Sequence, residues 1–160
     1  MERLLREFDR DTPHRVQGLF CNIFILQNRL QTACEKIQTD ISMKQWLLLA
    51  MQQACPPPKT LTNVGRLMGC SRQNIKKLAS ALEKKGCLTL REGPNNSIHL
   101  QETEKVSQYS AQMDQRRGEV LRLLFADFSE EEIARFYSLF RKLYAGMERV
   151  EEYVKGEEKS

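Results

Sequence analysis

A short segment that starts at Ser71 constrains the fold of this 160-residue chain more than any other. Ser71 suits the N-cap of a helix, because a serine hydroxyl can accept a hydrogen bond from an unpaired backbone N–H of the first turn. Apolar residues follow at helical spacing and predict one buried stripe: Ile75, Leu78, Ala79 and Leu82. The opposite side of such a helix carries amide, ammonium and hydroxyl groups but no carboxylate: Gln73, Lys76, Lys77, Ser80 and Lys84.

The residues before and after this helix predict a helix-turn-helix. Upstream, Thr60 or Thr62 can cap a short first helix that runs to Met68. Gly69 then makes the tight turn between the two helices. Gly86 ends the second helix, because glycine readily adopts the left-handed conformation found at many helix C-termini.

A β-hairpin is predicted directly after the second helix. The runs 87–91 and 97–100 are strand-like, and the turn-rich residues 93–96 (Gly-Pro-Asn-Asn) join them. Helix, turn, helix and hairpin together form a winged helix-turn-helix pattern. The second helix of such a unit has the diameter and polarity to enter the major groove of DNA.

Positive charge is concentrated in the same part of the chain. Residues 59–91 contain eight Lys or Arg and a single acid, Glu83, a net charge of +7, whereas the whole chain carries +4. A concentrated positive field is expected of a surface that binds phosphates. A solvated helix face is the alternative explanation for a run of lysines, and the combination of charge, cap, turn and hairpin favours DNA binding.

Long helices are predicted on both sides of this unit, so the fold is mainly α with a small β-wing. Thr12 and Pro13 supply a capping residue followed by proline at the first helical position, and apolar residues continue at helical spacing to Ile37. Ser42 begins the next helix with a capping box. After the hairpin, a long polar helix is predicted over 102–127.

The last predicted helix carries an apolar seam. Ser129 and Glu132 form a capping box at its start. From there apolar residues alternate in steps of three and four, the a/d pattern of a coiled coil: Ile133, Phe136, Phe140, Leu143, Met147, Val150 and Val154. The seam can pack on the first long helix of the same chain or on the same helix of a second chain. We favour a homodimer, because one short recognition helix seldom binds DNA tightly alone.

Composition and cysteine usage exclude several other classes. The N-terminus is unlike a secretory signal, and no apolar run is long enough to span a membrane. The five cysteines form no CxxC pair, and with only two histidines they predict no metal site, no cofactor and free thiols in a reducing, cytoplasmic setting. The sequence holds no Ser/His/Asp set and no glycine-rich phosphate loop, so no enzyme is predicted.

The chain resembles the multiple-antibiotic-resistance regulator (MarR) family of bacterial transcription factors over nearly its whole length. The resemblance is carried by residues 60–75, through both helices and their turn, and by 82–88, LEKKGCL, which is similar to the family's LexxGli signature. It implies a homodimer that binds pseudo-palindromic double-stranded DNA. It also implies a repressor relieved by a small-molecule effector or by thiol oxidation.

The same resemblance implies how the chain is organised. It indicates a single MarR-like domain, 1–160, in which a winged helix-turn-helix is flanked by N- and C-terminal dimerisation helices. The dimerisation helices are expected at 12–40 and 102–155, and the DNA-binding unit at 42–101.

The predicted wing departs from the family's pattern. Family wings usually carry an arginine at the tip that reaches the neighbouring minor groove, whereas residues 93–96 are uncharged and Arg91 at the base is the nearest cation. Asn95 and Asn96 can hydrogen-bond a phosphate or a sugar but add no Coulomb attraction. Weak engagement of the wing is therefore expected.

Residue chemistry suggests which side chains contact bases and which contact the DNA backbone. Base contacts are expected from an amide, which pairs with adenine, and from lysine, which pairs with guanine: Gln73, Lys76, Lys77 and, as a further candidate, Asn74. Phosphate contacts set register and not sequence, and they are assigned to Arg72, Ser80, Lys84 and Arg91. A structural role is the alternative for Arg72. The cap residue Ser71 and the wing residues Asn95 and Asn96 complete the predicted DNA-binding set.

Two alternative functions remain open at this stage. Cys21 lies on the first long helix at a point similar to the reactive cysteine of the family's peroxide-sensing branch, as the resemblance suggests. Met43 and Trp46 stand where that branch has tyrosines, and neither can stabilise a thiolate by an oxygen-centred hydrogen bond. A buried packing cysteine is the default interpretation. The other alternative is a protein-interaction module that uses the winged helix without DNA, which the neutral wing supports and the positive charge opposes.

Overall fold

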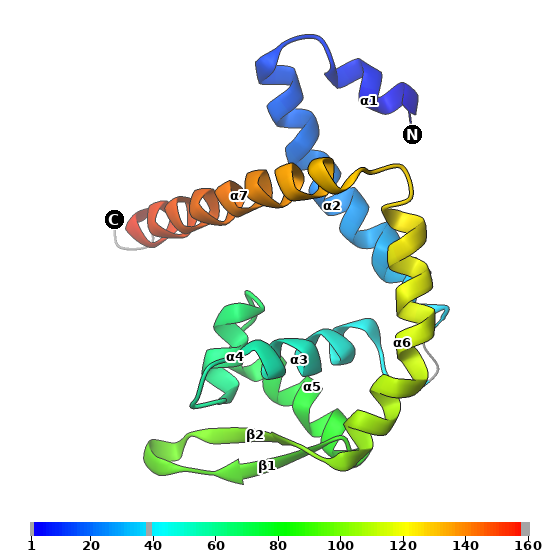
Figure 1. The fold of residues 1–160 in the computed structure, drawn as a ribbon. Helices are drawn as coiled ribbons and strands as arrows, with labels where there is room; N and C mark the ends of the chain where they lie inside the picture. The colour runs from blue at the N-terminus through cyan, green and yellow to red at the C-terminus, as the bar shows by residue number, and fades with distance from the viewer. Residues whose placement is uncertain (1, 38–39, 158–160) are drawn as a thin grey trace. The chain divides into compact units, whose positions relative to one another are not determined.

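Helices dominate the computed structural model, which describes residues 2–37 and 40–157 (Figure 1). The elements follow in the order α1 (Glu2–Phe8), α2 (Thr12–Glu35), α3 (Met43–Ala54), α4 (Leu61–Leu67), α5 (Arg72–Lys84), β1 (Leu88–Glu92), the 3₁₀ turn η1 (Pro94–Asn96), β2 (Ile98–Glu102), α6 (Glu104–Leu124) and α7 (Glu130–Glu157). They fall into two units, Met1–Met113 and Asp114–Ser160. The predicted class, mainly α with a two-stranded wing, is confirmed.

The core of the first unit lies beneath α5. Helices α3 and α4 and strand β1 pack against α5, as Figure 1 shows. Their fully buried side chains are apolar: Leu48, Leu61, Val64, Ile75, Ala79 and Leu82. Of the predicted stripe only Leu78 is partly exposed, and it packs at the edge of the same cluster. The apolar side of α5 therefore fixes which of its side chains face outward.

The capping residues of α3, α4 and α5 are those predicted. Ser42 and Gln45 form the capping box of α3, each accepting a hydrogen bond from the other's backbone N–H. Thr60, and not Thr62, caps α4, and Ser71 caps α5 by accepting from the backbone N–H of Asn74. Because these bonds join residues three apart, the local sequence determines them.

Both predicted turn glycines have the left-handed backbone that the helix-turn-helix requires. Gly69 lies between α4 and α5 with φ +60°, and Gly86 follows α5 with φ +74°. An L-residue with a side chain is strained in this region, whereas glycine is not. The chain can therefore turn sharply at both ends of α5.

The first long helix, α2, begins differently from the prediction. Residue Asp11, not Thr12, caps α2; its carboxylate accepts from the backbone N–H of His14 at 2.9 Å, and Thr12 is already helical. This backbone bond, together with one to the His14 ring, holds the pKa of Asp11 below its usual value. The segment that precedes it is a helix, α1, and its Phe8 lies so close to Gly18 on α2 that a Cβ there would clash.

Strands β1 and β2 form one antiparallel hairpin, the predicted wing. Leu90 pairs with Leu100 and Arg91 with His99. Each strand begins one residue later than predicted, and β1 ends one residue later and β2 two residues later. At the tip, Asn95 and Asn96 both have φ 55°, a left-handed conformation that asparagine tolerates better than most residues. Hydrogen bonds from Gly93 N to Ser97 O and from Ser97 N to Pro94 O close the turn.

The second unit contains the end of α6 and all of α7. The predicted capping box of Ser129 and Glu132 is present, and the backbone N–H of Ser129 lowers the pKa of the Glu132 carboxyl. Gly118 does not interrupt α6. Helix α7 runs unbroken for 28 residues and buries none of the side chains described in it. Among the residues that the structure describes, no helix is long and apolar enough to cross a membrane.

Removing a buried side chain beneath α5 tests this description of the core. We expect Leu82→Ala, at a fully buried position, to lower the free energy of unfolding by about 2–5 kcal/mol, because it loses apolar burial and leaves a cavity. The same change at Leu67, which is 50% exposed, should cost about 1 kcal/mol or less. Urea unfolding followed by circular dichroism measures both, and equal losses would contradict the proposed packing.

Candidate nucleic-acid interface

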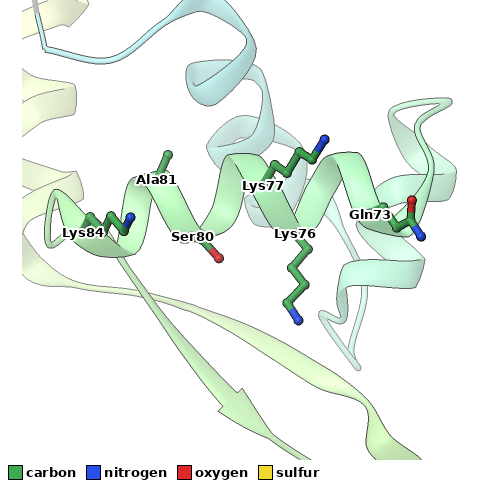
Figure 2. Close-up of a pocket in the computed structure, with 6 residues that line it drawn as sticks. All are labelled: Gln73, Lys76, Lys77, Ser80, Ala81 and Lys84. Atoms are coloured by element: carbon green, nitrogen blue, oxygen red, sulfur yellow. The ribbon is translucent and has the colours of Figure 1, made fainter.

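The outer face of α5 gathers the polar side chains that the sequence singles out. Gln73, Lys76, Lys77 and Lys84 are exposed and Ser80 is half-buried. Together with Ala81 they line a shallow, open pocket of about 540 Å³ (Figure 2). We call these five polar residues the α5 outer face. In Figure 2, Lys76 and Ser80 point to one side of α5 and Lys77 and Ala81 to the other. Ala81 was not predicted, although its spacing of four from Lys77 places it in the same row.

The outer face of α5 carries hydrogen-bond donors without a competing negative charge. The one acid on α5, Glu83, is turned toward the wing, where its Oε1 accepts from the backbone N–H of Leu90 at 2.9 Å. Its carboxylate is therefore engaged with β1 and not with the lysines. A phosphate or the acceptor-rich edge of guanine would suit such a face.

Side-chain bonds to backbone carbonyls hold the C-terminal end of α5. Lys85 donates from Nζ to the Asp40 carbonyl at 2.5 Å and to Gln45 Oε1 at 3.1 Å, which ties this end to the start of α3. Thr103 donates to the Gly86 carbonyl at 2.6 Å, and Lys105 to the Lys85 carbonyl at 2.7 Å. Cationic and hydroxyl donors are favourable here, because the last carbonyls of a helix lack intrahelical partners.

The N-terminal end of α5 is joined to the wing by Arg72. Its Nη2 donates to the backbone carbonyl of Asn96 at 3.0 Å. Both residues are exposed, so the rest of the guanidinium remains accessible. This contact supports the alternative that the sequence left open for Arg72, a structural role. The two residues are 24 positions apart, so helical or strand spacing could not have predicted the contact.

The other predicted wing and cap residues are also on the surface. Arg91 lies near the tip end of β1 opposite His99, and Asn95 lies at the tip, both exposed. The hydroxyl of Ser71 is engaged as the helix cap, while Asn74 in the first turn is exposed. These side chains belong to α5, to its cap and to the hairpin that contacts α5, so the predicted DNA-binding residues lie on neighbouring elements of the first unit.

The cysteines show no arrangement of metal ligands. Cys21 is half-buried on α2, and Cys55 and Cys87 are buried. Within the described residues no three His, Cys, Asp or Glu side chains are grouped so that they could hold a metal ion. A redox role for Cys21 stays a prediction.

The predicted seam on α7 is exposed within its own unit. Its seven side chains are between 41% and 51% exposed: Ile133, Phe136, Phe140, Leu143, Met147, Val150 and Val154. The rings of Phe136 and Phe140 continue a row that runs from Phe125 through Phe128 to Tyr144, with neighbouring centroids 5.6–6.2 Å apart. We call the seven residues the α7 seam. A large apolar face of this kind is typical of an association surface.

Comparison with known proteins identifies the fold. No protein-family model and no curated protein matches the sequence. Solved structures do match over most of the chain. A MarR/EmrR family transcriptional regulator from Acinetobacter sp. ADP1 superposes with a TM-score of 0.73 at 16% identity, covering 83% of this chain and 96% of that one.

Two further matches were solved with a bound partner. The S. aureus MepR–DNA complex has a TM-score of 0.64 at 17% identity and covers 82% of this chain and 95% of that one. The PcaV regulator from Streptomyces coelicolor, in complex with its natural ligand, has a TM-score of 0.61 at 22% identity and covers 75% and 89%. The chain therefore has the winged helix-turn-helix fold of the MarR-family transcriptional regulators.

Proposed function

We propose that this chain is a sequence-specific DNA-binding transcription regulator. The observation that carries the proposal is the orientation of α5: its apolar stripe is buried and its outer face presents amide, ammonium and hydroxyl groups to solvent. A helix of this polarity fits the major groove, where each base pair presents a distinct pattern of donors and acceptors. The fold supports this proposal, since it is shared with a family of non-enzymatic regulators and with MepR, which was solved with DNA.

Within this proposal, two sets of side chains on the DNA-binding surface have different tasks. Gln73, Lys76 and Lys77, with Asn74 beside them, contact base edges. Phosphates are held by the residues around them: Ser71, Ser80, Lys84, Arg91, Asn95 and Asn96. Backbone contacts fix the position of the helix, so that a few base contacts suffice for specificity.

The regulator acts as a homodimer in this proposal. The α7 seam offers seven half-exposed apolar side chains at coiled-coil spacing, and α2 adds a further exposed apolar face through Val16, Leu19, Phe20 and Ile23. A two-fold axis would place two α5 helices in successive major grooves, about 34–36 Å apart, on a pseudo-palindromic operator. The expected dimerisation helices, 12–40 and 102–155, contain both faces, and 42–101 contains the DNA-binding unit.

We assign the protein the role of a repressor relieved by a small-molecule effector. The support is the shared fold, because PcaV was solved with its natural ligand. An effector relieves repression only when it binds the DNA-free state more tightly than the DNA-bound state. Selecting bound duplexes from random DNA, and then adding candidate effectors to the selected complex, tests recognition and relief in turn.

Salt dependence separates DNA binding from docking to a protein. We expect the affinity for the selected duplex to fall about 10³- to 10⁵-fold between about 50 and 200 mM salt if a dimer makes six to ten phosphate contacts, because binding releases condensed counterions. Fluorescence anisotropy on a labelled duplex measures the slope. A shallow slope, with binding retained at high salt, would favour the protein-interaction module.

The lysines of α5 differ in their expected effects. Lys77→Ala should relax specificity by about 1–3 kcal/mol at one base pair, because it removes a contact to a base edge. Lys84→Ala, at the far end of the same helix, should weaken binding to all duplexes alike and lower the salt slope by about two, one for each subunit of the dimer. Titration of both variants on single-base operator mutants measures the difference. Uniform weakening by Lys77→Ala would place that side chain on the phosphate backbone.

A charge in the α7 seam tests the homodimer. Phe140→Glu should raise the dimer dissociation constant at least about a hundredfold, because two carboxylates would be buried without partners. Ser138→Glu is the matched control, since Ser138 is exposed on the opposite side of α7. Sedimentation velocity over a range of concentrations measures both. A dimer that survives Phe140→Glu would show that the seam is not the interface.

A further inference from the structure

We propose that Arg72 supplies the wing tip with the positive charge that its own residues lack, and that it makes α5 and the wing bind DNA as one rigid surface. We define the wing tip as residues 93–96. The inference rests on the proposed DNA binding and deepens it: it names the residue that extends recognition to the base pairs flanking the α5 site. Arg72 thereby becomes a specificity-determining residue and not one phosphate contact among several.

The wing alone has no net positive charge with which to attract DNA. The wing tip consists of glycine, proline and two asparagines. Near the tip the charge of Arg91 is opposed by Glu92, the next residue on β1. A neutral hairpin gains nothing from the phosphate field, which supplies most of the sequence-independent attraction to DNA.

Arg72 places a guanidinium against this neutral tip. Its Nη2 donates to the Asn96 carbonyl at 3.0 Å, from the first turn of α5 to the far end of the hairpin. Asn96 is held in the left-handed region by the closed turn, in which Ser97 N bonds to Pro94 O at 3.1 Å. A guanidinium has five N–H donors in a planar fork, so one bond to Asn96 leaves donors for a phosphate or a base edge.

A second side-chain bond holds the wing at the middle of β1. Glu83, near the C-terminus of α5, accepts from the backbone N–H of Leu90 on β1 at 2.9 Å. The hairpin is therefore attached to α5 at the middle of β1 through Glu83 and at its tip through Arg72. Groups that are already immobilised lose less conformational entropy on binding, so their contacts contribute more affinity.

The place of Arg72 predicts what it contacts. It lies at the N-terminal end of α5 beside the wing tip, and so beyond the row of Gln73, Lys77 and Ala81 on the outer face. DNA bound along α5 would meet this cation just outside the base pairs that the helix contacts. Arginine is attracted to narrow minor grooves, which A-tracts favour, so we expect a preference for A-tract flanks.

The experiment compares duplexes that share the selected core but differ in their flanks. Wild type should bind the duplex with A-tract flanks about fivefold more tightly than the one with G·C-rich flanks. Arg72→Gln should lose this preference and keep its discrimination among core variants. Lys84→Gln is the matched control: it removes one charge from the same helix in each subunit, so it should lower the salt slope by about two, as Arg72→Gln does, but keep the flank preference.

Moving the charge onto the wing provides a rescue. Pro94 is exposed at the start of η1 and is not one of the two positive-φ residues, so it can be replaced without left-handed strain. Pro94→Arg in the Arg72→Gln background should restore most of the fivefold flank preference, whereas Pro94→Ala in that background should not. Thermal unfolding of each variant checks that the fold is retained.

A measurement without DNA tests the attachment itself. In Arg72→Gln the Ser97 amide should exchange its hydrogen faster than in wild type, because the tip is no longer held to α5, while amides of α3 should be unchanged. Flank preference retained in Arg72→Gln, or lost equally in Lys84→Gln, would overturn the inference, as would unchanged exchange at Ser97. Failure of wild type to bind any duplex would instead refute the proposed function.

Discussion

Burial of one side of α5 is the interaction on which the rest of the structure depends. Ile75, Ala79 and Leu82 are inaccessible to solvent, and each large side chain buried in this way stabilises the fold by about 1.5–3 kcal/mol. Rotating α5 about its axis by one residue would expose part of this stripe and bury a lysine. The same burial therefore stabilises the unit and determines which polar groups face outward, so stability and the composition of the α5 outer face cannot vary independently.

Polar attachments at both ends then restrict how α5 and the wing can move. Lys85 is bonded to the start of α3, Glu83 to β1, and Arg72 to the wing tip. Each exposed bond of this type contributes only about 0.5–1.5 kcal/mol to stability. Their larger effect is on geometry: the hairpin and α5 keep a fixed separation, and a rigid pair can match the spacing of two grooves at a smaller entropic cost.

Local signals in the sequence predicted most of the first unit and missed its long-range bonds. The caps of Ser42 and Ser71 and the turn at Gly69 depend on neighbours within a few residues, and all are confirmed. The cap of α2 was wrong by one position, because Asp11 offers a carboxylate one residue before Thr12. Arg72 and Asn96 are 24 positions apart, and their contact depends on how the hairpin folds back, which no spacing rule describes. The assignments of side chains to bases and phosphates stay predictions.

The proposed dimer would account for two features at once: the exposed apolar side chains of α7 and the small area of the α5 outer face. A 28-residue helix with none of its described side chains buried leaves a large apolar area in water, at a cost of about 25 cal/mol per Å². A single α5, about four turns long, makes too few base contacts for tight and selective binding. The proposed association of two copies through the seam would remove the first cost. It would also link two α5 helices, so that binding of one raises the effective concentration of the other at its half-site. Selectivity would then multiply over two half-sites, and a weakly charged wing could be tolerated in each.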